Sequence, residues 1–337
     1  MSEENTTVQP AENAPVSSEE TVNTEKKEKK ELAKIQVQKI YRLLNGEWDD
    51  FAELSGPPQR LDDFYLVFER HLTPEGEIML ETELDMEGGE IQKTVNTFNE
   101  KGKLVQQELY NEGVLAEKTI YEYDEKDRVV KETREFEEGF PLTAYFKYDD
   151  KDRVIEKRVD DSEGELQKRE TYTYDETYSD KIATHNVYDE EDNLSLEESF
   201  EWMEKDGEVK ASKQTVKDHS LNSFRRTEFF DPKEREDNIG YATFNEREKV
   251  VEYVKVVFDE KGREAEEHSF SVNDSDNFKV YYTYDDEDRV VMQEQKQEDK
   301  IISKIHRRFN TEGHAEIISV RSFSRGIYVD YYEYKYY

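Results

Sequence analysis

The sequence predicts an all-β fold: an elongated antiparallel meander of repeated β-hairpins in an open sheet, single-layer or curled, with a short N-terminal capping helix. Three observations lead to this prediction. An aromatic phrase recurs along the chain, the residues before it alternate with period two, and a turn signal follows it. A phrase repeated at regular spacing indicates one supersecondary unit that is copied many times.

The phrase is clearest at 121–130, 146–155 and 282–291, where it reads Tyr-Glu-Tyr-Asp-Glu-Lys-Asp-Arg-Val-Val or a close variant. Steps of 25, 25 and 26 residues separate its second aromatic residue at Phe98, Tyr123, Tyr148 and Tyr174. A step of 14 leads to Tyr188, and 14 also separates Phe230, Phe244 and Phe258 before the long step returns at Tyr284 and Phe309. The two spacings predict full units with long outer turns and shorter units with clipped turns.

Each phrase has the chemistry of a tight hairpin. Asp149 suits the first position of a type I turn, because its carboxylate can accept from backbone amides two residues on. The fourth turn position requires a left-handed residue, as in a G1 bulge. That position holds Gly102, Gly262 and Gly313 in three copies and Asp127, Asp152 and Asp288 in three others. Since β-branched residues such as Val129 and Val130 follow at once, a helix cap does not fit.

The pattern Tyr-x-Tyr-Asp-x-x-[Gly/Asp]-Arg-[Val/Leu] at 121–129, 146–154 and 282–290 resembles the YD repeat of the bacterial rearrangement-hot-spot and teneurin-like families. The resemblance implies repeated hairpins in one long antiparallel sheet that spirals, often into a hollow shell around a toxin. No toxin-like domain is expected after the last strands, and the units are too few to close a large shell. We therefore expect the sheet to stay open.

The N-terminal part divides by composition into three segments. Residues 1–28 are predicted to be a disordered polar and acidic tail. Residues 29–45 are predicted to form a helix, because Ala33, Val37, Ile40, Tyr41 and Leu44 make one apolar stripe and Asn45-Gly46 suits a C-cap. This helix either caps the repeat array or docks a partner. Residues 46–64 are expected to be a connecting strand and linker, and 65–337 the hairpin-repeat β domain.

Composition agrees with a thin sheet. Only 34% of residues are hydrophobic and 39% are charged, yet 12% are aromatic, and mean hydropathy is −1.08. A net charge of −35 argues against nucleic acid and anionic membranes as partners. Spread over nearly every segment, this charge serves solubility or attracts a basic protein partner.

The sequence indicates no chemistry of its own. There is no cysteine, secretory signal or apolar stretch long enough for a membrane span, so a cytoplasmic location is expected. The histidines at 71, 185, 219, 268, 306 and 314 show no metal-ligand spacing. Asn273–Asn277 resembles the start of a calcium loop but suits an Asx turn better. We therefore expect no enzyme activity and no catalytic, cofactor or metal residues.

The last strand is rich in tyrosine. Alternation places Tyr328, Asp330, Tyr332 and Tyr334 on one face and Val329, Tyr331, Glu333 and Lys335 on the other. These rings either cover the end of the sheet or form an aromatic platform, or an edge open to β-augmentation. The expected function is a non-enzymatic binding or scaffold protein, adaptor- or immunity-like. The alternative is a structural or surface protein that self-assembles by its sheet edges or binds glycans on a Tyr-rich face.

Overall fold

The computed structural model describes residues 32–46, 61–273 and 277–337, which form strands and a single 3-10 turn, η2 (Leu61–Asp63). The strands are β1 (Ile35–Leu44), β2 (Tyr65–Leu72), β3 (Ile78–Leu84), β4 (Glu90–Phe98), β5 (Leu104–Asn111), β6 (Val114–Tyr123), β7 (Val129–Phe136), β8 (Leu142–Tyr148), β9 (Val154–Asp160), β10 (Leu166–Tyr174), β11 (Ile182–Tyr188), β12 (Leu194–Lys205), β13 (Glu208–Asp218), β14 (Ser223–Phe229), β15 (Ile239–Phe244), β16 (Val250–Phe258), β17 (Glu264–Ser271), β18 (Phe278–Tyr284), β19 (Val290–Gln297), β20 (Lys300–Phe309), β21 (Ala315–Ser322) and β22 (Gly326–Tyr336).

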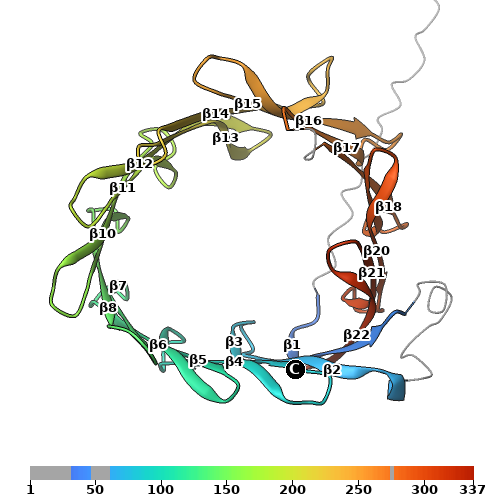
Figure 1. Cartoon of the computed structure of the whole chain (residues 1–337), viewed down its shortest axis with the longest axis horizontal. Helices are drawn as coiled ribbons and strands as arrows, with labels where there is room; N and C mark the ends of the chain where they lie inside the picture. The colour runs from blue at the N-terminus through green and yellow to red at the C-terminus, as the bar shows by residue number, and fades with distance from the viewer. Residues whose placement is uncertain (1–31, 47–60, 274–276) are drawn as a thin grey trace, which may run out of the picture. The chain divides into compact units, whose positions relative to one another are not determined.

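The strands form one closed antiparallel barrel. Each strand pairs with the next along the chain, and β22 pairs with β1 over nine residue pairs, from Ile35 opposite Tyr336 to Leu44 opposite Tyr328. Figure 1 shows the strands following one another around a ring. The prediction of an all-β hairpin repeat is confirmed, but the prediction of an open sheet is wrong. Closure removes the two edges that an open sheet would leave unpaired.

The predicted N-terminal helix is also wrong. Residues Ile35–Leu44 form β1, which pairs with β2 on one side and β22 on the other. Of the apolar residues that suggested a helical stripe, those within β1 lie on both faces of the strand, and one of its two partners, β22, is nearly three hundred residues away. The predicted tail at 1–28 lies outside the described residues, as do 47–60 of the predicted linker.

An aromatic latch joins neighbouring hairpins. The Tyr148 hydroxyl donates to the carbonyl of Val129 in the preceding hairpin (2.6 Å), and the Arg128 guanidinium lies over the Tyr148 ring at 4.4 Å. Arg128 also binds Asp124 of its own turn, with 2.7 Å between Nε and Oδ2. Equivalent hydroxyl-to-carbonyl bonds of 2.6 to 2.8 Å are made by Tyr123, Tyr174, Tyr284 and Tyr334. The phrase therefore supplies both the turn and its contact with the next turn.

The turn prediction is confirmed at the left-handed position. Asp127, Asp152 and Asp288 have φ of 61°, 63° and 61°, and Gly102 and Gly262 have φ of 74° and 77°. In the Asp149 turn, the carboxylate accepts from the amides of Lys151 and Arg153 at 2.9 and 3.0 Å. Asp can therefore occupy the left-handed turn position, where Gly is usual, because the hydrogen bonds from the backbone amides to the first Asp of the turn hold the turn in place.

The step of 14 residues has a different meaning from the one expected. It corresponds to a single strand and its turn, so it moves the aromatic residue to the opposite end of the barrel. Tyr188 and Phe244 end β11 and β15, whereas Tyr174 and Phe258 end β10 and β16. Trp202, 14 residues after Tyr188, takes the latch role, and its indole Nε1 donates to the Ile182 carbonyl at 2.7 Å.

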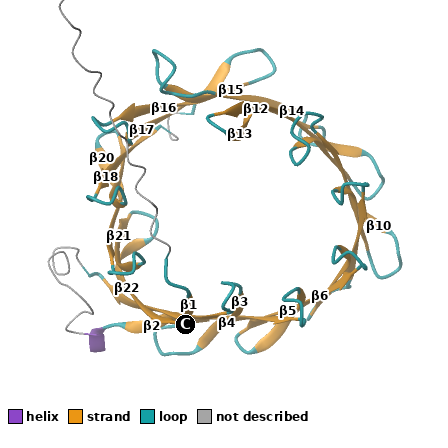
Figure 2. Cartoon of the chain, turned by 180° about the vertical axis from the view of Figure 1, so that it is seen from behind, coloured by secondary structure: helices purple, strands orange, loops and turns teal. Residues whose placement is uncertain are grey.

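The two faces of the sheet can be told apart at the closure. Phe64 packs on Ile317, Val329 and Tyr331, and Figure 2 shows the 3-10 turn just before Phe64 on the outer side of the ring. Because side chains alternate along a strand, Asp330 faces inward. Only Ile317 and Val329 are fully buried among the described side chains, so the wall is one layer without a thick core.

An ion pair on the inner face joins β1 and β22, the two strands whose pairing closes the barrel. Arg42 of β1 binds Asp330 of β22 with two bonds, Nε to Oδ1 at 2.8 Å and Nη2 to Oδ2 at 2.9 Å. Burial raises the pKa of Asp330 in spite of the hydrogen bonds from Arg42. Asp330 is only 5% exposed, so its carboxylate depends on Arg42 to remain charged.

We expect Tyr148→Phe to lower the free energy of unfolding by about 1 kcal/mol, since it removes the latch hydrogen bond and keeps the ring. Tyr145→Phe is the matched control, because Tyr145 lies three residues earlier on the same strand and is 45% exposed. Urea titration measures both. Equal losses in the two variants would contradict the latch.

We expect Arg42→Ala to cost about 3–5 kcal/mol at pH 7, because it leaves a buried carboxylate unpaired. The raised pKa of Asp330 fixes the sign of the pH dependence. The penalty applies above that pKa and shrinks as the pH falls, since the neutral acid is cheaper to bury. Lys147→Ala, which breaks the exposed pair with Glu156 (2.7 Å), is the control and should cost under about 1 kcal/mol. A pH-independent loss in Arg42→Ala would contradict this account.

Candidate binding sites

The two ends of the barrel carry different turns. We call the end formed by turns after even-numbered strands the even rim and the other end the odd rim. The described turns of the even rim are 73–77, 99–103, 124–128, 149–153, 175–181, 206–207, 230–238, 259–263, 285–289 and 310–314. Those of the odd rim are 85–89, 112–113, 137–141, 161–165, 189–193, 219–222, 245–249, 298–299, 323–325 and the described part of 272–277.

Charge separates the rims between residues 85 and 193. The five odd-rim turns in this span contain twelve Asp and Glu and no Lys or Arg. The four even-rim turns contain ten Asp and Glu with seven Lys and Arg. On the even rim these cations bridge neighbouring turns: Lys101 binds Asp127 at 2.7 Å, and Lys126 binds Asp152 at 2.8 Å. On the odd rim Asp192 is likewise paired, with Arg169 of β10 at 2.7 Å, but the turns themselves contain no cation in this span, so this part of the odd rim has the more negative field.

The odd rim also exposes large apolar side chains. Its turns hold Met86, Phe140, Leu221, Val272 and Phe323, which are 61% to 98% exposed. No described turn of the even rim carries an exposed side chain of this kind. Met86 and Phe140 lie in turns that contain Asp or Glu and no Lys or Arg, whereas the turn of Leu221 contains no acidic residue and that of Phe323 contains Arg325.

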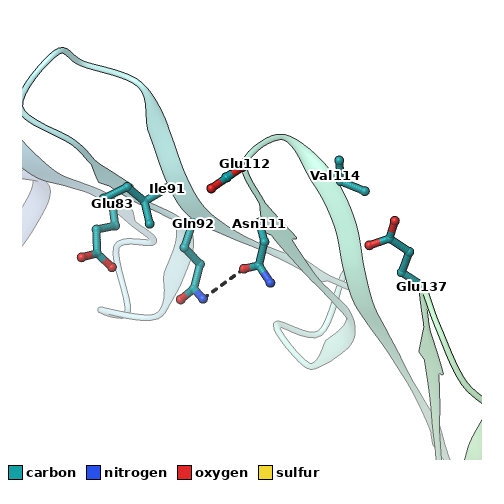
Figure 3. Close-up of a pocket in the computed structure, with 7 residues that line it drawn as sticks. All are labelled: Glu83, Ile91, Gln92, Asn111, Glu112, Val114 and Glu137. Carbon is teal, nitrogen blue, oxygen red and sulfur yellow. Dashed lines mark hydrogen bonds between the residues drawn. The ribbon is translucent and has the colours of Figure 1, made fainter.

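A shallow pocket of about 480 Å³ lies on the odd rim where β4, β5 and β6 meet. Ile91 and Val114 line it and are 42% and 50% exposed. In Figure 3, Val114 lies between the side chains of Glu112 and Glu137. The dashed bond in that figure joins Gln92 Nε2 to Asn111 Oδ1 at 3.3 Å. The pocket can thus receive an aliphatic side chain with a cation on either side of it.

A groove of about 910 Å³ lies on the even rim. The β12–β13 hairpin forms one wall, with Met203 and Ala211. The long β14–β15 loop forms another, with Phe230 and Pro232, and Phe229 lies at its start. Five Lys or Arg and five Asp or Glu line the groove, so its charges balance. It differs from the acidic pocket in both shape and electrostatics.

A charged cluster lies on the inner face between β10 and β12. The His185 ring contacts two carboxylates, with Nε2 2.9 Å from Glu170 and Nδ1 2.8 Å from Glu198, and stacks on Tyr172 at 4.8 Å. Both ring nitrogens can donate only when the imidazole is protonated. Burial opposes the charge of Glu170, but hydrogen bonds from Tyr172, Lys168 and His185 lower its pKa to about 2. Each member has a partner, so the cluster braces the wall.

The remaining histidines do not converge. His71 and His268 bind the neighbouring Glu69 and Glu266, and His314 bonds to the Ala33 carbonyl. Across the described ranges, no three His, Asp or Glu side chains are arranged to hold a metal ion. The suggested calcium-like segment falls partly outside the described residues, and its last residue, Asn277, accepts from the Ser271 amide at 2.6 Å.

The tyrosine-rich C-terminal strand is not an edge. β22 pairs with β21 and β1 along its length, so β-augmentation there would require the ring to open. The predicted division of its faces agrees with the register. Tyr332, Tyr334 and Tyr336 stack along the inner face at 6.3 and 6.0 Å, and the Tyr334 hydroxyl is bound to the Ala315 carbonyl.

The described residues contain no helix long and apolar enough to cross a membrane. No protein-family model and no curated protein matches the chain. The chain is similar to solved structures at low identity. These include the Tc holotoxin pore of Photorhabdus luminescens (9% identity, TM-score 0.29, covering 82% of this chain and 16% of that one) and TcdB2–TccC3 (12%, 0.29, 80% and 16%). A porin-like protein from Bacteroides uniformis is a third (9%, 0.27, 90% and 99%). The chain thus spans about a sixth of the toxin chains it matches.

Neither surface site was expected from the sequence. The odd rim had a visible signal, because large apolar residues such as Phe140 and Phe323 stand between the predicted strands. The groove had a weaker signal in the sequence, namely the length of the segments that form β12 and β13. Neither could be located before the alternation of turns between two rims was known.

The Glu170 cluster predicts a defined acid sensitivity. A carboxylate with a pKa of about 2 in the fold and 4.5 otherwise contributes about 3 kcal/mol above pH 4.5, and this is lost as the pH falls toward 2. Glu170→Gln should therefore be less stable than the wild type at pH 7, and the difference should disappear only below about pH 2. Chemical denaturation at several pH values measures the difference. A constant difference over this range would contradict the assignment.

Proposed function

We propose that this protein is a non-enzymatic binding protein that holds a basic protein partner at its odd rim. The observation that carries the proposal is the combination, on one part of this rim, of the acidic turns between 85 and 193, which contain no Lys or Arg, with the exposed Met86 and Phe140 and the pocket at Ile91 and Val114. A partner segment with Lys or Arg beside an aliphatic residue complements both features. An adaptor or immunity role suits such a protein.

The pocket at Ile91 and Val114 gives the contact a defined centre. An aliphatic side chain placed there would shed water from both groups, while Glu112 and Glu137 meet flanking cations. The acidic field would speed encounter and make it depend on salt. The apolar contact would supply the part of the affinity that persists at high salt.

We further propose that the chain is a divergent relative of the YD-repeat proteins. Support comes from the phrase itself, whose Tyr, Asp and Arg make the latch and the turn in this barrel. The alternative of a glycan-binding surface draws on the inner tyrosines, but the hydroxyl of Tyr334 is already bound to the wall. Assembly by sheet edges would need an opened ring. Binding at the odd rim requires neither the release of the Tyr334 hydroxyl nor the opening of the ring.

A capped peptide of alternating Lys and Leu tests the proposal, with a Glu and Leu peptide of equal length beside it. We expect the first to bind, with affinity falling at least tenfold between 50 and 500 mM NaCl, and the second not to bind. Fluorescence anisotropy measures both. Salt-independent binding, or binding of both peptides, would contradict the proposal.

A matched pair of triple variants locates the site. Glu112→Gln, Glu137→Gln and Glu138→Gln together remove three exposed charges from the odd rim. Glu100→Gln, Glu125→Gln and Asp150→Asn remove three exposed charges from the even rim. We expect the first set to weaken the Lys and Leu peptide at least tenfold and the second less than threefold. Equal effects would show that only bulk charge acts.

A further inference from the structure

The β12–β13 hairpin extends farther beyond its neighbours than the repeat requires. Pairing of β12 with β11 ends at Ser199, and pairing of β13 with β14 starts only at Lys213. Residues 202–205 and 208–211 therefore pair with each other, and neither 200–205 nor 208–212 has a second described partner strand. In the β8–β9 hairpin, by comparison, only the last three residues of β8 extend beyond its pairing with β7. Within the described residues, this hairpin thus presents a strand edge on β12 and another on β13.

The groove of about 910 Å³ lies beside the β13 edge. Lys210 and Ala211 of the unpaired stretch of β13 line it, and the β14–β15 loop lines the other side. The loop is held in place by its own contacts. Arg235 binds Asp237 with two bonds of 2.8 and 2.7 Å and covers the Phe230 ring at 4.2 Å, while Lys205 binds Glu234 at 2.8 Å. The space where a neighbouring strand would pair is therefore kept open.

We propose that an extended polypeptide segment binds in this groove as an added strand on the open edge of β13. A strand edge offers unpaired backbone donors and acceptors at regular spacing, which an extended peptide satisfies. Met203 and Phe229, 45% and 36% exposed, provide apolar contacts for alternate side chains of the segment. Methionine adapts to side chains of different shape, which suits such a surface.

The charge and volume of the groove define the segment. Because five cations and five anions line it, a segment with little net charge fits better than the basic one expected at the odd rim. The volume falls in the range of pockets that enclose one small or peptide-sized ligand. A second copy of the chain would have to bring a whole hairpin with its own charged edge. A short, alternating apolar segment is the occupant that the groove favours.

A displayed library of random dodecapeptides, selected on the wild-type protein in 0.5 M NaCl, tests the proposal, since this salt suppresses electrostatic capture at the odd rim. We expect enriched peptides to alternate apolar residues and to lack proline in the bound segment. A synthetic enriched peptide should protect the amides of 208–212 from hydrogen exchange. An absence of enriched peptides, or protection confined to other strands, would overturn the proposal.

Paired variants then place the contact. We expect Met203→Glu to weaken the selected peptide at least tenfold, and Met79→Glu to change it less than twofold. Met79 is a fair control because it is a similarly exposed methionine near the even rim, 38% against 45%. A central proline in the peptide should also cost at least tenfold. Equal effects of the two methionine variants, or wild-type dimers abolished by Met203→Glu, would overturn the proposal. Loss of the odd-rim interaction alone would leave these results unchanged.

Discussion

The aromatic latch is the contact on which the barrel depends. A single-layer wall has almost no buried core, since only Ile317 and Val329 are fully buried among the described side chains. Backbone pairing joins the strands, but it does not fix how one hairpin end lies against the next. The Tyr148 hydroxyl on the Val129 carbonyl, with Arg128 over the ring, adds that restraint and recurs around the even rim. Stability then comes from sums over neighbours, as in other repeat architectures.

This arrangement explains how so charged a chain folds. The latch uses the cation of each turn twice, against a carboxylate of its own turn and against the next aromatic ring, as Arg263 does with Asp259 and Tyr284. Cations placed in this way neutralise the even rim locally. The turns of the odd rim between 85 and 193 contain twelve Asp and Glu and no Lys or Arg, so this part of the net charge of −35 lies where it can act on a partner.

The sequence predicted the local structure well and the closure badly, for a physical reason. Turn chemistry is local, so the left-handed positions at Asp127 and Asp152 could be identified from the phrase. The nature of β1 could not. Its apolar residues Val37, Ile40 and Tyr41 satisfy a helical period and also lie on both faces of a strand, and only pairing with Tyr332 and Lys335, nearly three hundred residues away, decides between the two. Periodicity carries no information on such a distant partner.

The distribution of charge could not be predicted for the same reason. The total charge follows from composition, whereas its division between the rims depends on which turns lie at the same end of the barrel.

Departures from a repeat are informative because the repeat itself is enough for folding. Where the aromatic spacing falls from 26 to 14 residues after Tyr174, the chain also forms its longest hairpin, β12–β13, and soon afterwards its longest described turn, 230–238. In β7 and β9 the pairing with the following strand begins at the third residue, Lys131 and Glu156, whereas in β13 it begins only at the sixth, Lys213, which leaves 208–212 without a partner on that side. Leaving those five residues unpaired costs backbone hydrogen bonds, and the ordered loop beside them prevents the edge from being covered. A binding role accounts for both features at once, because a segment added there would complete the pairing that the chain omits.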